Sequence, residues 1–182
     1  GSGIDVAASC FGGIISFHKM DAQYIQYLTI PDDLIIMPVW SGKSMSTRRL
    51  IDKVNRFKKS NPQKYRSIIA RMHQISEQSI KHLNERHLAG FLHLCNEYNE
   101  TMKELGSASR ADIISQAHRE LAEIARASGA YYKPSGAGGG DIGLFFTDSK
   151  TVARRVSDNI LRSNYQMLNF KIANNGSRIV LK

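Results

Sequence analysis

The sequence predicts a single α+β domain in which an antiparallel sheet is covered by several helices. Three short apolar segments near the N-terminus, residues 14–18, 24–30 and 34–39, have the length and composition of strands. Longer segments in the middle of the chain repeat apolar residues at the spacing of an amphipathic helix. With 182 residues, of which 42% are hydrophobic, the chain can bury one substantial core. No internal repeat indicates a second domain.

The N-terminal elements are expected to be a short helix and three neighbouring strands. The helix should cover Asp5–Phe11, with Gly12 and Gly13 closing it. Ile14–His18 and Tyr24–Ile30 should pair as a hairpin, and Leu34–Val39 should add the next strand. Strands so close in sequence imply one antiparallel sheet.

Four helices are expected to follow. Ser46 can cap the first, in which Leu50 and Phe57 share an apolar face. Asn61 and Pro62 form a favourable N-cap and first-turn pair for the second helix.

The third helix should begin near Arg86 and end at Gly106, because glycine accepts the left-handed conformation that follows many helices. Ser109 should then open the fourth helix, and Gly129 should end it.

The C-terminal third should contain a strand at Ile142–Thr147, a helix at Lys150–Arg162 and another strand at Gln166–Ala173. Asn175 and Gly176 favour a tight reversal into Arg178–Leu181, since Asn-Gly suits a type I′ turn.

The chain is basic, with 25 Lys and Arg against 16 Asp and Glu and a formal net charge of +9. Such a charge attracts phosphorylated metabolites, nucleotides, nucleic acid or acidic membranes alike. Because the basic residues are scattered along helices without interleaved aromatic residues, solvated helix faces are favoured over a nucleic-acid groove. No nucleic-acid partner is therefore expected.

Cysteine content and hydropathy further limit the classes of protein to which this chain could belong. Cys10 and Cys95 lie far apart without a C-x-x-C spacing, which favours neither a disulfide framework nor a zinc site and suits a reducing, cytoplasmic setting. The six histidines form no H-x-x-x-H pair, so metal ligation by histidine is not expected. No apolar run approaches the roughly 20 residues that span a bilayer, and the N-terminus lacks a signal-peptide layout.

Lys133-Pro-Ser-Gly-Ala-Gly-Gly-Gly-Asp141 is the most informative stretch of the chain. Glycines tolerate positive φ and lack Cβ, so successive N–H groups can turn inward and form a nest for an anion. A flexible linker or a tight turn explains the composition equally well. The stretch matches neither the Rossmann G-x-G-x-x-G pattern nor the Walker motif.

Three segments together resemble a known family. They are Gly1-Ser-Gly-Ile-Asp5-Val-Ala-Ala-Ser9, Trp40-Ser-Gly-Lys43-Ser-Met-Ser46-Thr47 and the glycine stretch. They occur in the order and spacing seen in GHMP-type small-molecule kinases, and most resemble those of the phosphomevalonate kinases. Mevalonate kinases are less similar, since their first segment usually has Asn where this chain has Val6.

This resemblance implies the fold and activity of an ATP-dependent phosphotransferase. Residues 1–182 would form the C-terminal, acceptor-side domain, with a ferredoxin-like core. The N-terminal ATP-binding domain, with its P-x-x-x-G-L-G-S-S-A-A loop, is absent from this chain, so the chain alone is expected to be inactive. The implied reaction converts phosphomevalonate to diphosphomevalonate with ATP and Mg²⁺, in the cytoplasm. Mevalonate, another GHMP substrate, or a non-catalytic anion- or partner-binding role stay open as alternatives, and so does a homodimer.

The resemblance also implies the site residues. Asp5 corresponds to the aspartate often assigned as catalytic base, although a helix cap would explain a lone aspartate there. If the acceptor is a phosphate monoester, its phosphate has a second pKa of about 6 and needs no strong base at neutral pH. Asp5 is then expected to orient the acceptor. Lys133 would be the second catalytic residue. Expected phosphate or substrate contacts are Ser2, Gly3, Lys43, Ser46, Ser135, Gly136, Ala137, Gly138, Gly139, Gly140 and Asp141.

Overall fold

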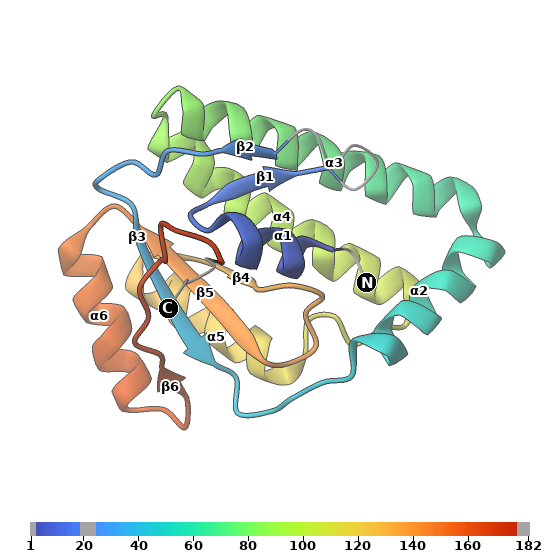
Figure 1. The fold of residues 1–182 in the computed structure, drawn as a ribbon. Helices are drawn as coiled ribbons and strands as arrows, with labels where there is room; N and C mark the ends of the chain where they lie inside the picture. Colours follow the sequence, from blue (N-terminus) through green and yellow to red (C-terminus); the bar gives the residue numbers. More distant parts are fainter. Residues whose placement is uncertain (1–2, 19–24, 178–182) are drawn as a thin grey trace, which may run out of the picture.

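A computed structural model describes residues 3–18 and 25–177 of the chain (Figure 1). The helices are α1 (Ile4–Phe11), α2 (Thr47–Ser60), α3 (Pro62–Asn84), α4 (Leu88–Ser109), α5 (Gln116–Ser128) and α6 (Lys150–Leu161). The strands are β1 (Ile15–Phe17), β2 (Ile25–Tyr27), β3 (Ile35–Trp40), β4 (Tyr131–Pro134), β5 (Ile142–Thr147) and β6 (Gln166–Met167). The α+β class is confirmed, and every strand pair found in the described part of the chain is antiparallel.

The core is built on a four-stranded sheet in the order β4-β5-β3-β6. Side chains alternate across β5, so Phe145 enters one core cluster and Phe146 another. Phe145 packs with Leu121 of α5 and Val156 of α6, whereas Phe146 packs with residues of α4. The sheet therefore lies between α5 and α6 on one face and α4 on the other.

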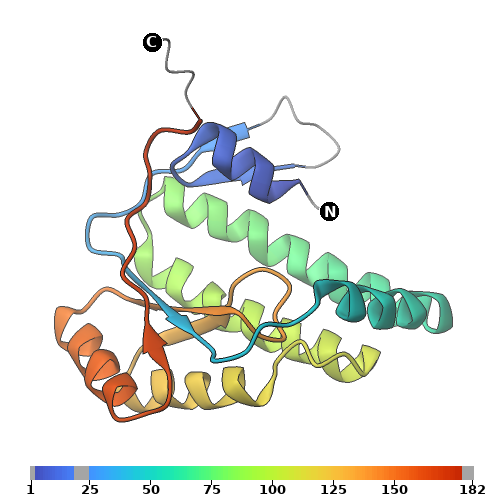
Figure 2. The same ribbon diagram turned by 60° about the horizontal axis from the view of Figure 1, so that its bottom comes forward.

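Figure 2 shows α1 and the β1–β2 hairpin at one end of the molecule, and α5 and α6 at the other. The segment before Arg178 runs beside α1: the amide of Gly13 donates to the Ala173 oxygen at 2.7 Å, and the amide of Ser177 donates to the Ser9 oxygen at 2.9 Å. Gly176 passes so close that an added Cβ would lie 1.9 Å from the Cys10 oxygen. The C-terminal segment thus fastens this end to the rest of the fold.

The expectation of one sheet for the first three strands is wrong. β1 and β2 form the hairpin, but β3 pairs with β5 and β6 in the other sheet. The physical reason is burial: Val39 of β3 is completely buried and Ile36 packs on the opposite face, so this strand needs helices on both sides. Alternation within a single strand does not say which neighbour it pairs with.

Two helix boundaries also differ from expectation. α4 continues through Gly106 to Ser109 and ends at Arg110, which takes the left-handed conformation with φ 54°. Gly106 instead allows the returning chain to approach, because an added Cβ would lie 3.0 Å from the Ala111 oxygen. Residues 111–115 are then not helical, and Ser115, rather than Ser109, caps α5 by accepting from the His118 amide.

Most of the remaining elements lie where the sequence predicted them. α1, the hairpin, β5 and α6 lie where they were expected, and Gly129 ends α5 with φ 81°. β4 was not predicted, and the strand expected at Gln166–Ala173 covers only Gln166–Met167. The expected strand Arg178–Leu181 lies outside the described residues. No helix in the described ranges is long and apolar enough to cross a membrane.

The two expected N-caps allow a matched stability test. The Asn61 side chain accepts from the Lys64 amide at 3.2 Å, whereas Ser46, also at an N-cap position, makes no side-chain cap bond. Asn61→Ala should therefore lower the free energy of unfolding by about 1 kcal/mol. Ser46→Ala should lower it much less, because no hydrogen bond is lost. Urea denaturation of both variants checks this, and equal losses would contradict it.

Candidate functional site

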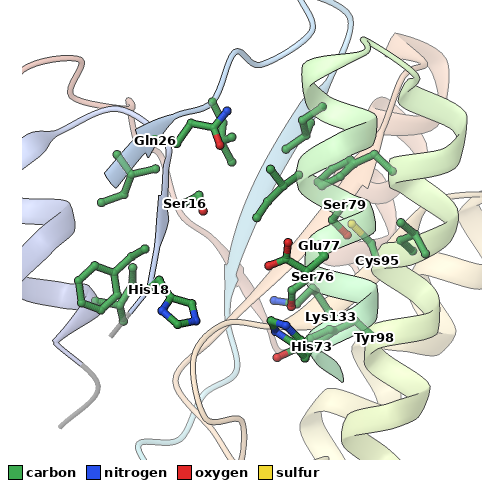
Figure 3. Close-up of a pocket in the computed structure, with 18 of the residues that line it drawn as sticks. Ser16, His18, Gln26, His73, Ser76, Glu77, Ser79, Cys95, Tyr98 and Lys133 are labelled. Carbon is green, nitrogen blue, oxygen red and sulfur yellow. The ribbon is translucent and has the colours of Figure 1, made fainter. Parts of the chain in front are cut away.

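A cavity of about 1190 Å³ lies between the α1–hairpin end of the molecule and helices α3 and α4 (Figure 3). Asp5 lines it from α1, Lys133 from the end of β4, and Ser135 and Gly136 from the glycine stretch. Residues that are 128 positions apart, Asp5 and Lys133, thus share one cavity. We call this space the main cavity.

Lys133 is a partly buried cation with no acidic ion-pair partner among the described residues. Its Nζ donates to the Pro134 oxygen at 2.9 Å and lies 5.6 Å from the centre of the Tyr98 ring. None of the ion pairs found among the described residues includes it. Burial lowers the pKa of this ammonium, since a charge that leaves water without a counter-ion is destabilised. An anion in the main cavity would relieve that cost.

Cys95 lies beside this ammonium on the wall of the main cavity. Burial raises the pKa of its thiol to about 12, and the charge of Lys133 only partly offsets this effect. The thiol is therefore neutral at physiological pH and supplies neither a counter-ion for Lys133 nor a nucleophile.

Beyond β4, three amides of the glycine stretch donate to backbone oxygens. The Ser135 amide donates to the Ile142 oxygen at 2.9 Å, the Gly139 amide to the Ile113 oxygen at 2.6 Å, and the Asp141 amide to the Lys43 oxygen at 2.7 Å. These three amides are not available to an anion. Within residues 3–18 and 25–177, no hydrogen bond is found for the amides of Gly136, Ala137, Gly138 and Gly140. No hydrogen bond of the Asp141 carboxylate is found in these ranges either, so backbone oxygens hold the loop.

Several expected contact residues do not reach the main cavity. Lys43 and Ser46 are exposed and do not line it, although the Lys43 oxygen supports the loop. Gly3 precedes α1 with φ 86°, and it is not among the lining residues either. Ser2 lies outside the described residues. The structure therefore gathers Asp5, Lys133, Ser135 and Gly136, while the α2 N-terminus stays apart.

Sequence reasoning missed the wall that α3 contributes. His73, Ser76 and Glu77 line the main cavity, and Figure 3 shows His73 near Lys133 and Tyr98. Their spacing of three and four residues places them on one helix face. That polar stripe beside the apolar one was visible in the sequence, but only the tertiary fold shows that it faces a cavity. The hairpin opposite adds Ser16, His18 and Gln26.

His118, fully buried on α5, ties the glycine stretch to the sheet. Its Nε2 lies 3.0 Å from the Gly140 oxygen and its Nδ1 lies 2.6 Å from the Tyr132 hydroxyl. A neutral ring satisfies both contacts when Nε2–H donates to Gly140 and Nδ1 accepts from Tyr132. Burial lowers the pKa of His118, outweighing the Gly140 hydrogen bond and the nearby charges of Asp112 and Asp141. The sequence alone gave no signal for this bridge.

Comparisons with known proteins find relatives in the group of kinases that the three sequence segments resemble. No protein-family model matches the chain. A curated phosphomevalonate kinase from Streptomyces sp. (strain CL190) is 23% identical over 172 residues, covering 82% of this chain and 46% of the relative. The chain thus spans about half the length of that relative.

Solved structures show the same fold. Streptococcus pneumoniae phosphomevalonate kinase, in complex with phosphomevalonate and AMPPNP, gives a TM-score of 0.77 at 15% identity, over 93% of this chain and 55% of that one. L. major mevalonate kinase, in complex with R-mevalonate, gives a TM-score of 0.77 at 19% identity, over 89% and 48% of the two chains.

The fold is therefore the α+β fold of the GHMP kinase C-terminal domain. The comparisons confirm the resemblance to GHMP kinases, and within that group to the phosphomevalonate kinases.

The loop predicts a contrast between two glycines. An added Cβ at Gly138 would lie 2.4 Å from the Ile113 oxygen, whereas one at Gly136 meets nothing within 4 Å. Both have positive φ, so Gly136→Ala should cost about 1 kcal/mol through backbone strain alone. Gly138→Ala should cost clearly more, because the loop must also move away from Ile113. Thermal unfolding of both variants measures the difference. Equal losses of stability would contradict the close packing of Gly138 against Ile113.

The His118 bridge predicts a pH dependence. The folded-state pKa lies below the unfolded value of about 6.5, so its contribution is complete above that pH and is lost as the pH falls toward the folded pKa. His118→Leu should lower the free energy of unfolding by about 1 to 3 kcal/mol for each buried partner left unpaired. His118→Gln should cost less, since its amide can still donate to Gly140. Urea titrations at about pH 7.5 and about pH 5 should show both variants losing part of the acid sensitivity.

Proposed function

We propose that this chain is the acceptor-side half of an ATP-dependent kinase of the GHMP type, and that its acceptor is phosphomevalonate, converted to diphosphomevalonate. The observation that carries the proposal is the partly buried ammonium of Lys133, which has no ion-pair partner in the described part of the chain and faces a cavity shared with Asp5 and the glycine stretch. In this proposal a nucleotide-binding domain outside these 182 residues supplies ATP.

The chemistry of the main cavity suits an acceptor that is an anion with an apolar body. Lys133, His73 and His18 supply basic groups on its wall. Ile15, Ile80 and Phe91 supply apolar surface on the same wall. The resemblance to phosphomevalonate kinases supports a phosphorylated acceptor over an alcohol without phosphate.

The central problem of this reaction is charge. Acceptor phosphate and γ-phosphate repel each other, and the transition state spreads negative charge over the equatorial oxygens. Lys133 would offset that charge from one side; of the residues with unpartnered loop amides, Gly136 alone is found to line the main cavity. The second pKa of a phosphate monoester is about 6, so its oxygen is already mostly deprotonated at neutral pH. Asp5 would then orient the acceptor rather than remove a proton.

Mg²⁺ fits this site only together with phosphate oxygens. Among the described residues no group of three or more His, Cys, Asp or Glu side chains could hold a metal ion. Asp5 and Glu77 are the acidic residues that line the main cavity, and Mg²⁺ is commonly held by one or two carboxylates plus substrate phosphates. Bound in that way, the ion would neutralise charge on the phosphates.

The protein would act in the cytoplasm on soluble substrates.

Lys133→Met tests the proposal in this chain directly. It should weaken binding of phosphomevalonate and of inorganic diphosphate by about tenfold or more, because a charge-assisted hydrogen bond is lost. Lys150→Met removes the same charge from α6, away from the main cavity, and should leave both affinities unchanged. Isothermal titration measures both. Unchanged affinity in Lys133→Met would refute the role of this ammonium.

Activity distinguishes the acceptors. In a protein that carries both halves, ADP release should depend on phosphomevalonate and not on mevalonate, and Lys133→Met should slow it. Faster release with mevalonate would identify the alternative kinase. Anion binding without any ADP release would favour a non-catalytic binding module.

A further inference from the structure

A second cavity, of about 320 Å³, lies between α2, α3, α4 and the glycine stretch. These elements meet on one side of the molecule, as Figure 1 shows. Its walls are mostly apolar and include Val54 of α2, Met72 of α3 and Met102 of α4. We call it the apolar cavity.

The apolar cavity is large enough for a small ligand and is lined like a ligand site. Small-molecule sites generally have volumes of about 300 to 1,000 Å³, with apolar walls and a few polar groups that fix orientation. Met72, Tyr65 and Tyr98 are only partly buried and pack against the surrounding core cluster. An occupant would therefore bury apolar surface that the folded chain alone leaves in contact with water.

The polar groups of the apolar cavity favour an anion. None of its lining residues is acidic or basic. Gly136 and Ala137 are exposed, and their amides have no hydrogen-bond partner in the described parts of the chain. Lys58 does not line the cavity, but its Nζ lies 5.5 Å from the centre of the Tyr65 ring, and Tyr65 does line it. Two free donors thus belong to the lining, and a positive charge lies beside one of its aromatic residues.

We propose that the apolar cavity is a second ligand site, which binds a small apolar molecule carrying one anionic group such as a carboxylate. The apolar part lies among the residues of α2, α3 and α4, and the anionic group faces the Gly136 and Ala137 amides. This site shares Tyr98 and Gly136 with the main cavity, but none of its other lining residues. The two sites therefore adjoin at Tyr98 and Gly136 and differ in the rest of their walls, and the second site does not depend on the proposed reaction.

Methionine methyl groups provide a direct readout. The chain has six methionines, and Met72 and Met102 line the apolar cavity. Met37 and Met167 pack against the cluster of α5, α6 and the sheet, and serve as internal references. In protein labelled with ¹³C at the methionine methyl groups, phenylacetate should shift Met72 and Met102 saturably and leave Met37 and Met167 unchanged. Phenylacetamide, which has the same shape without the charge, should bind about tenfold more weakly.

Variants separate this site from the main cavity. Ile51→Trp, at the partly exposed edge of the apolar cavity, should fill it and abolish the phenylacetate shifts. Ile69→Trp is the matched control, because Ile69 is an exposed apolar residue of α3 that lines neither cavity. Lys133→Met should leave the phenylacetate shifts intact while weakening diphosphate binding. Val54→Phe gives a second filled variant if Ile51→Trp does not fold.

The outcomes decide the proposal. Saturable shifts that Ile51→Trp or Val54→Phe removes, and that Ile69→Trp and Lys133→Met retain, support it. Absence of saturable shifts at Met72 and Met102, or their loss in Lys133→Met, overturns the second site. Equal binding of phenylacetate and phenylacetamide overturns the anionic part of the ligand.

Discussion

The His118 bridge is the interaction on which the arrangement of the site depends. It joins α5 to the Tyr132 hydroxyl on one side of the glycine stretch and to the Gly140 oxygen on the other. Tyr132 in turn lies over Gly143, where an added Cβ would be 1.9 Å from the Tyr132 oxygen. The stretch between β4 and β5 is thus fixed near both of its ends. A neutral, fully buried imidazole suits this role because it donates at one nitrogen and accepts at the other.

The glycine stretch, fixed in this way, begins at the partly buried ammonium of Lys133. Lys133 follows Tyr132 directly, and its Nζ is satisfied by the Pro134 oxygen and the face of the Tyr98 ring rather than by a carboxylate. A carboxylate partner would stabilise the free protein but would compete with any anionic ligand. A carbonyl oxygen and an aromatic ring hold the charge without neutralising it. The result is a positive charge that is fixed in place and free to pair with an anion.

The sequence predicted the parts of this structure that are specified locally. Asn61 caps α3 and Gly129 ends α5 because each acts through its own backbone. Predictions that depended on distant partners were less successful. β3 was assigned to the wrong sheet because its partner, β5, is about a hundred residues away. Gly106 resembled a helix end, but it accommodates the returning chain at Ala111. His118 and the α3 wall of the main cavity were missed for the same reason.

At the candidate site, too, the surrounding fold decides what the sequence motifs alone leave open. The sequence motifs led to the prediction that Asp5, Lys133 and the glycine stretch act together, and in the structure Asp5, Lys133, Ser135 and Gly136 line one cavity. They also suggested that every amide from Gly136 to Gly140 serves an anion, yet Gly139 donates to Ile113. Composition shows that a loop can form a nest, but only the surrounding backbone decides which amides stay free.

Tyr98 and Gly136 line both cavities, so the two cavities adjoin at these residues. The Lys133 Nζ lies 5.6 Å from the centre of the Tyr98 ring, and the same residue lines the apolar cavity. The anion proposed for the main cavity depends on the Lys133 ammonium, whereas the ligand proposed for the apolar cavity depends on the apolar side chains of α2, α3 and α4. Lys133→Met removes the ammonium but none of the residues that line the apolar cavity, and for this reason the variant separates the two sites.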